Sequence, residues 1–215
     1  MTGLAPKTLA IFDAVSSLYC IQNFVLVGGT GMALQINHRL SEDLDFCKWV
    51  PVSNAANGID IKTIEVELKN KFSEVKTNPL SFDQVDFYAR GVKLSFFNEV
   101  GYTKPDFEPI KLKENLLSAP LGVIGSMKIK TMFERNVFRD YYDVFVLLKE
   151  GVVTIDQLIE SSVRYHSKLK KQMIINRLQR WEQVANEKGF AFLKPKYDAS
   201  AREIGEFLIK LTSQG

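Results

Sequence analysis

Two aspartates separated by one residue follow a glycine-rich turn in the N-terminal part of the chain. Asp43 and Asp45 flank Leu44, and in a β-strand this spacing sends both carboxylates to one face. Neighbouring carboxylates repel each other without a cation between them, and Mg²⁺ or Mn²⁺ bound by carboxylates together with substrate phosphates removes that cost. The pair therefore predicts a divalent-metal site.

The turn before the aspartates has the composition of a phosphate-binding segment. The apolar run 24–27 is typical of a buried strand, and it ends at Gly28 and Gly29, where backbone can approach a ligand closely. We expect Thr30 to cap a helix over 31–36, so that free N–H groups, a hydroxyl and the positive end of a helix dipole meet. Taken singly, such a turn is often only a turn, and such a pair of acids is often a solvated strand edge. Their order and close spacing favour a site.

Two separated blocks of sequence together indicate a protein family more specifically than either block alone. The first is Gly28-Gly29-Thr30-x-x-Ala33-Leu34 followed by His38-Arg39-x-Ser41-x-Asp43-Leu44-Asp45-Phe46, and the second is Lys128 followed by Arg139-Asp140-x-x-Asp143. Both blocks resemble the nucleotidyltransferase AbiEii/AbiGii toxin family, within the polymerase-β-like nucleotidyltransferase superfamily. The resemblance implies metal-dependent transfer of a nucleoside monophosphate from a nucleoside triphosphate (NTP) to an acceptor. It also implies a toxin–antitoxin or phage-defence role with a cognate antitoxin; some relatives modify tRNA ends.

The resemblance also implies roles for individual residues. The implied catalytic residues are Asp43, Asp45, Lys128, Asp140 and Asp143, and the implied nucleotide-binding residues are Gly28, Gly29, Thr30, Arg39, Ser41 and Lys128. Lys128 would contact the triphosphate, and Asp140 or Asp143 would orient Lys128 or activate the acceptor hydroxyl. Without the resemblance, helical acids three residues apart are usually surface charge. Arg39 either contacts phosphate or forms a buried pair with Asp43.

A β-hairpin is predicted where two alternating runs, 85–89 and 92–97, flank Arg90-Gly91 as a two-residue turn. In this register Asp86 lies opposite Ser95, and cross-strand partners share a face. One face would carry Asp86, Tyr88, Lys93 and Ser95. Superfamily members usually have a third carboxylate where Ser95 stands. Two interpretations remain open: Asp86 supplies or supports this third metal ligand, or it is an ordinary solvent-facing acid.

The pattern predicts an α+β (mixed α/β) fold, with a nucleotidyltransferase-like mixed sheet flanked by helices and a helical C-terminal half. Helical spacing of apolar residues covers 9–20 and 60–72, and the chain is helical from Leu121 onward. We expect residues 1–120 to form the nucleotidyltransferase-like core and residues 121–215 to form a helical domain that completes the active site.

Composition excludes several classes of protein. The 215 residues contain no apolar run long enough for a membrane span and no signal-peptide pattern at the N-terminus, so a cytoplasmic location is expected. Two cysteines are too few for a disulfide framework or a cysteine-based zinc site.

Positive charge is concentrated in one segment. Residues 161–181 contain six basic residues and no acidic ones, although the whole chain carries only +3. These residues are Arg164, Lys168, Lys170, Lys171, Arg177 and Arg180. They either contact a polyanionic acceptor such as RNA or form a solvated helical surface.

The predicted function is therefore a metal-dependent nucleotidyltransferase acting on RNA. Two alternatives remain: a catalytically silent nucleotide- or RNA-binding module on the same scaffold, or a nucleotidyltransferase acting on a small molecule of the antibiotic type.

Overall fold

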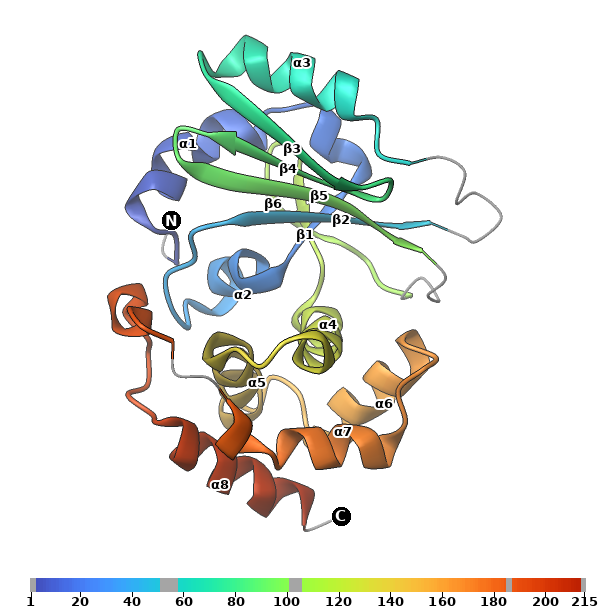
Figure 1. Cartoon of the computed structure of the whole chain (residues 1–215), viewed down its shortest axis with the longest axis vertical. Helices are drawn as coiled ribbons and strands as arrows, with labels where there is room; N and C mark the ends of the chain where they lie inside the picture. Colours follow the sequence, from blue (N-terminus) through green and yellow to red (C-terminus); the bar gives the residue numbers. More distant parts are fainter. Residues whose placement is uncertain (1–2, 51–57, 101–105, 185–186, 214–215) are drawn as a thin grey trace. The chain divides into compact units, whose positions relative to one another are not determined.

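The computed structural model describes residues 3–50, 58–100, 106–184 and 187–213. The chain divides into two compact units, Met1–Pro120 and Leu121–Gly215. The first unit contains a mixed sheet with helices and the second is helical (Figure 1), which confirms the predicted fold class. Within the described ranges, no helix is long and apolar enough to cross a bilayer.

In the described part of the first unit, seven strands form one sheet in the order β3-β4-β5-β2-β1-β7-β6. Neighbouring strands are antiparallel except for the β2–β5 and β1–β7 pairs, which are parallel. The strands are β1 (Val25–Val27), β2 (Leu44–Val50), β3 (Val75–Ser81), β4 (Gln84–Ala89), β5 (Val92–Val100), β6 (Ile110–Lys113) and β7 (Leu116–Ser118).

Helices cover both faces of this sheet. They are α1 (Pro6–Ser16), the 3₁₀ helix η1 (Cys20–Asn23), α2 (Gly28–Ile36) and α3 (Ile61–Lys71). Figure 1 shows α1 and α3 on one side of the sheet and α2 on the other. The Asp60 carboxylate caps α3 by accepting a hydrogen bond from the Thr63 backbone N–H, at 3.1 Å.

The core of the first unit lies between the sheet and helices α1 and α3. Phe96 is at its centre: its ring stacks on Phe46, with centroids 4.8 Å apart, and meets the edge of Phe87. Phe12 of α1 and Leu68 of α3 belong to the same core. Apolar residues of β4 and β5 therefore face these helices, and the alternate residues of both strands occupy the opposite face.

The predicted hairpin is confirmed. Strands β4 and β5 pair with Ala89 opposite Val92 and Asp86 opposite Ser95. Arg90 and Gly91 form the turn with φ of +49° and +75°, as a type I′ turn requires.

In the second unit, helix α4 packs against α5 and α6, and α5 also packs against α8. The helices described here are α4 (Leu121–Glu134), α5 (Phe138–Lys149), α6 (Ile155–Tyr165), α7 (Lys171–Leu178) and α8 (Ala201–Thr212), with short 3₁₀ helices η3 (Trp181–Gln183) and η4 (Phe190–Leu193). Capping boxes begin α6, from Thr154 and Gln157, and α8, from Ser200 and Glu203.

Candidate active site

The Asp45 carboxylate lies directly against Gly28 in the first unit. Strand β1 is antiparallel to β2, with Val27 opposite Asp45, so Gly28 follows the point where the two strands meet. Gly28 has φ of +64°, and a Cβ on this residue would overlap Oδ2 of Asp45. Glycine is therefore required both by the backbone conformation and by the space that the carboxylate fills.

Lys93 balances the charge of the aspartate pair. Its Nζ lies 3.4 Å from Oδ2 of Asp43, and both side chains are about one third exposed. Burial alone would lower the pKa of Lys93, but the nearby carboxylates of Asp43, Asp45 and Asp86 outweigh it and raise the pKa. These carboxylates therefore already stabilise a positive charge, which is the property a metal-binding pair needs.

Asp86 is buried, so the interpretation of it as a solvent-facing acid is wrong. Only 7% of Asp86 is exposed, and its Oδ1 accepts a hydrogen bond of 2.8 Å from the Ser95 hydroxyl. Ser95 pairs with Asp86 on one side and with Asp45 on the other, so the three residues form one row across β4, β5 and β2. Among the described residues, no three His, Cys, Asp or Glu side chains are arranged to hold a metal ion. The idea that Asp86 supports the metal therefore stays a prediction.

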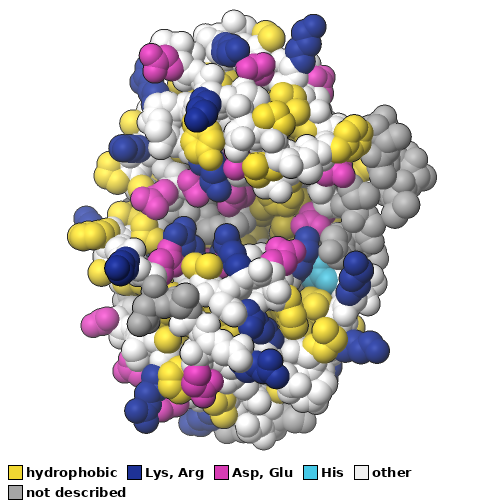
Figure 2. Space-filling view, viewed as in Figure 1, with side chains coloured by type: hydrophobic (Ala, Val, Ile, Leu, Met, Phe, Trp, Pro, Cys, Tyr) yellow, Lys and Arg dark blue, Asp and Glu magenta, His cyan; other side chains and the backbone are white. Residues whose placement is uncertain are grey.

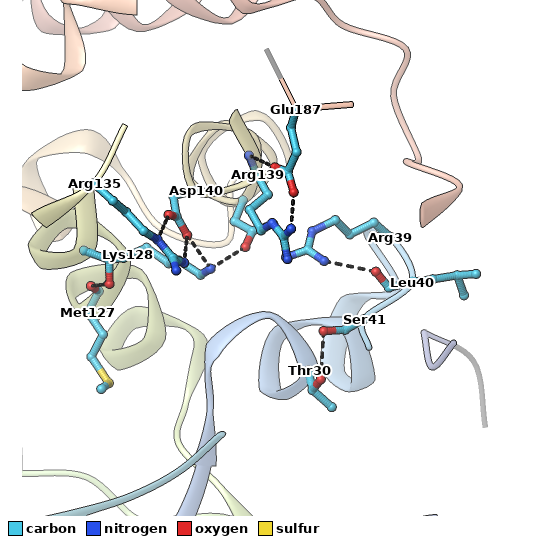
Figure 3. Close-up of polar contacts among 12 residues, drawn as sticks. Thr30, Arg39, Leu40, Ser41, Met127, Lys128, Arg135, Arg139, Asp140 and Glu187 are labelled. Atoms are coloured by element: carbon cyan, nitrogen blue, oxygen red, sulfur yellow. Dashed lines mark hydrogen bonds and ion pairs between the residues drawn. The ribbon is translucent and has the colours of Figure 1, made fainter. Parts of the chain in front are cut away.

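The predicted capping role of Thr30 is wrong. Helix α2 begins at Gly28, three residues earlier than expected, and no side chain caps it. The buried Thr30 hydroxyl instead lies 2.8 Å from the Ser41 hydroxyl and bonds the Asp43 carbonyl oxygen. Figure 3 shows the Thr30–Ser41 contact. These contacts fix the segment that leads into Asp43 and Asp45.

Arg39 lies beside the first turn of α2. It is 4% exposed, and its Nη1 donates to the Leu40 carbonyl oxygen at 3.0 Å (Figure 3). A Cβ on Gly29 would come within 2.5 Å of Arg39 Nη2 and 3.1 Å of Ser41 Oγ. Gly29, Arg39 and Ser41, all expected to bind nucleotide, are thus brought together.

In the second unit, Lys128 is held by both predicted aspartates. Its Nζ lies 2.9 Å from Asp140 Oδ1 and 2.7 Å from Asp143 Oδ2, and neither aspartate is exposed. The spacing of three residues on α5 points both carboxylates toward α4, where Lys128 lies.

Arg135 completes this group of charges. Its Nε lies 2.8 Å from Asp140 Oδ2 and its Nη2 lies 3.2 Å from Asp140 Oδ1 (Figure 3). Burial alone would raise the pKa of Asp140, but the charges and hydrogen bonds of Lys128 and Arg135 outweigh it, so the pKa lies below its usual range.

The six basic residues of the segment 161–181 do not lie on one element. Arg164 is in α6, Lys171 and Arg177 are in α7, and the other three are outside these helices. Arg177 is only partly exposed and bonds the Arg135 carbonyl oxygen and the Asn136 side chain. In the view of Figure 2, basic and acidic side chains are interspersed.

Sequence reasoning missed the roles of Lys93 and Arg135. The hairpin register places Lys93 on the face of Asp86 and Ser95, so its charge beside Asp86 was the available signal. Arg135 precedes Asp140 by five residues, across the connection between α4 and α5. This separation hides the contact, because helical spacing rules do not apply across a turn.

The strand–turn–helix with paired carboxylates on a mixed sheet defines the class of nucleotidyltransferase-like proteins. The family model of the nucleotidyl transferase AbiEii toxin, of type IV toxin–antitoxin systems, matches residues 20–210. The chain therefore belongs to this family of nucleotidyltransferase toxins.

Two relatives extend over nearly the whole chain. An uncharacterised protein of Aquifex aeolicus (strain VF5) is 25% identical over 209 residues, which cover 96% of this chain and 95% of that protein. The structure is also similar to MenT4, a nucleotidyltransferase toxin from Mycobacterium tuberculosis H37Rv, with a TM-score of 0.56. That match covers 96% of this chain and 84% of MenT4 at 15% identity, and it supports the fold alone.

The close fit of Asp45 against Gly28 can be tested with two glycine substitutions. Gly28→Ala and Gly151→Ala both place a side chain at φ of +64°, but nothing lies within 4 Å of a Cβ at Gly151. The shared backbone cost is about 1–2 kcal/mol, and overlap with Asp45 adds about 1–3 kcal/mol in Gly28→Ala. Denaturant unfolding measures both losses. Equal losses would contradict the proposed overlap.

The buried Asp140 carboxylate predicts a pH-dependent stability. Because its folded pKa is lowered, its contribution is fully present above the unfolded pKa of about 3.9 and is lost as the pH falls through the folded pKa. Asp140→Asn should lower the free energy of unfolding at pH 7 by about 3 kcal/mol. The difference from wild type should shrink below pH 4. Denaturant unfolding from pH 3 to 7 measures it, with the exposed Asp156→Asn as control; a constant difference would refute the assignment.

Proposed function

We propose that the chain transfers a nucleoside monophosphate from an NTP to an RNA acceptor, as the toxin of a toxin–antitoxin pair. The observation that carries the proposal is the Asp45 carboxylate placed against Gly28 at the start of α2. A helix N-terminus binds phosphate through its unpaired N–H groups and its dipole. A carboxylate suited to binding a metal ion and backbone N–H groups suited to binding a phosphate therefore lie at the same place.

The donor set of the first unit fits a divalent cation. Asp43 and Asp45 would hold Mg²⁺ or Mn²⁺, since carboxylate oxygens are the ligands these ions prefer. Such an ion, when bound, neutralises charge on the transferring phosphoryl group. Lys93, Asp86 and Ser95 lie around the pair and would position it.

The other residues would bind and orient the NTP. The N–H groups of Gly28, Gly29 and Thr30 would hold the β- and γ-phosphates, with the Arg39 guanidinium and the Ser41 hydroxyl beside Gly29. The Thr30 hydroxyl, which bonds the Asp43 carbonyl oxygen, would keep the aspartate segment in place.

The second unit would supply Lys128 as the triphosphate contact. Its ion pairs with Asp140 and Asp143 support an orienting role for both carboxylates more strongly than activation of the acceptor hydroxyl. The acceptor oxygen bonds to the α-phosphorus and the bond to the β-phosphate oxygen breaks. Pyrophosphate leaves with the electron pair, and the hydroxyl proton passes to a carboxylate or water.

RNA contact is assigned to the exposed members of the basic segment. Arg164, Lys168, Lys170, Lys171 and Arg180 are exposed, whereas Arg177 is engaged with the turn between α4 and α5. Exposed cations contribute affinity for phosphates without sequence selection.

One observation favours a second function. Ser95 stands where superfamily members usually have a carboxylate, and it bonds Asp86. A catalytically silent nucleotide- or RNA-binding module would tolerate this arrangement. Metal-dependent transfer of label therefore decides between the two functions.

Removal of either aspartate is expected to abolish transfer. Asp43→Asn and Asp45→Asn should each reduce transfer of label from α-labelled NTP to a bulk tRNA pool by at least about 100-fold, because charge stabilisation is lost. The exposed Asp106→Asn should match wild type. Undiminished transfer by both site variants would overturn the catalytic assignment. Label on a small acceptor with none on RNA would favour the antibiotic-type alternative.

The position of Lys93 predicts a measurable effect of Mg²⁺ alone on thermal unfolding. Lys93→Met leaves Asp43, Asp45 and Asp86 without their nearby ammonium, so the variant should unfold at a lower temperature without divalent ions. Added Mg²⁺ should then raise its unfolding midpoint more than that of wild type, because binding to the folded state stabilises it. The exposed Lys48→Met, on the neighbouring strand β2, is the control. Equal shifts in both variants would contradict the proposed metal site.

A further inference from the structure

A basic pocket lies in the first unit where β3 begins and β4 ends, beside the turn between β4 and β5. It has a volume of about 590 Å³, and its lining includes Lys69, Glu74, Lys76, Tyr88, Arg90 and Gly91. We call it the Tyr88 pocket.

A row of side chains connects the Tyr88 pocket with the aspartate pair. Lys76 of β3 pairs with Tyr88 of β4, and Tyr88 pairs with Lys93 of β5. Lys93 in turn contacts Asp43 at 3.4 Å. Cross-strand partners share a face, so the row crosses from the edge strand to β2 on the face opposite α1 and α3. Three strand spacings make this path about 15 Å long.

Positive charge predominates in the Tyr88 pocket. Lys76 and Arg90 line it together with Lys69, which is also ion-paired with Glu65 at 2.9 Å, and Glu74 is the acid in the lining. A fourth cation lies close, since a Cβ on Gly91 would be 3.8 Å from Lys7 Nζ. The type I′ turn at 90–91 fixes the backbone that carries Arg90.

An exposed aromatic ring stands among these cations. Tyr88 is 37% exposed, although burial would be the favourable state for a ring of this size. Cations that follow a backbone, together with an aromatic platform on which bases stack, are the combination used for single-stranded nucleic acids.

We propose that the Tyr88 pocket binds the single-stranded end of the acceptor RNA, with a base stacked on Tyr88 and phosphates near Lys76 and Arg90. The proposal rests on the proposed function, because it locates the acceptor of that reaction. RNA fits the Tyr88 pocket better than an acidic protein segment does. An acidic peptide would contact the cations but would not use the ring, and the row of side chains leads from the pocket to Asp43.

RNA binding separates this proposal from the transfer activity. Binding of a fluorescent 12-nucleotide single-stranded RNA is measured by anisotropy in wild type and variants. Tyr88→Ala should weaken binding about 5- to 150-fold, the effect of losing one stacked base. Tyr88→Phe keeps the ring and should bind like wild type, as should Tyr19→Ala, which removes a more exposed tyrosine of the same unit. Circular dichroism melting verifies that each variant is folded.

The charges give independent tests. Lys76→Ala combined with Arg90→Ala should lower the slope of log affinity against log salt by about 1.4, or about 0.7 for each phosphate contact. Glu74→Gln should tighten RNA binding. Lys48→Ala with Lys111→Ala, two exposed lysines outside the pocket, should leave the slope unchanged.

The possible outcomes are distinguishable. Unchanged RNA binding by Tyr88→Ala and by the double variant overturns the pocket proposal, even if Asp43 and Asp45 prove essential for transfer. Weakened binding without transfer by wild type upholds the pocket and overturns the proposed function. Displacement of RNA by poly-glutamate at equal charge concentration would assign the surface to an acidic protein segment instead.

Discussion

Repulsion between neighbouring carboxylates is the constraint on which the candidate site depends. Each unit gathers aspartates around a lysine: Lys93 lies beside Asp43 in the first, and Lys128 lies between Asp140 and Asp143 in the second, where Arg135 also pairs with Asp140. The two solutions differ in exposure. Lys93 is partly solvated, so another cation can replace its charge at moderate cost, whereas Lys128 is buried with both acids and must stay paired. The arrangement around Lys93 therefore suits exchange of one cation for another, and the arrangement around Lys128 suits a lysine held in a fixed position.

Local sequence patterns predicted much of the architecture and part of the candidate site. Alternation on both sides of Arg90-Gly91 was enough to give the hairpin with its register, because hairpin pairing depends on neighbouring residues. The start of α2 was misplaced because two glycines are poor helix formers, whereas the helix begins at Gly28. The contact of Lys93 with Asp43 depends on parallel pairing of β2 with β5, which no local pattern encodes.

Burial explains the remaining differences. Asp86 was ambiguous because an acid in an alternating strand usually faces water, and its burial depends on the neighbouring strands and on Ser95. The hydroxyl at this position hydrogen bonds a carboxylate, where a second carboxylate would repel it. At 15% identity to MenT4 the fold is retained, so the scaffold tolerates extensive change in sequence.

The parallel pairing of β2 with β5 also has a consequence for folding. The two strands pair residues 50 positions apart, such as Asp45 with Ser95, and the entropy of closing so long a loop must be overcome before the pairing contributes any stability. The row from Asp45 to Asp86 cannot exist before β5 has been synthesised and has joined β2. An incomplete chain on the ribosome therefore carries the aspartate pair without its surrounding residues, and assembly of the site is tied to completion of the sheet.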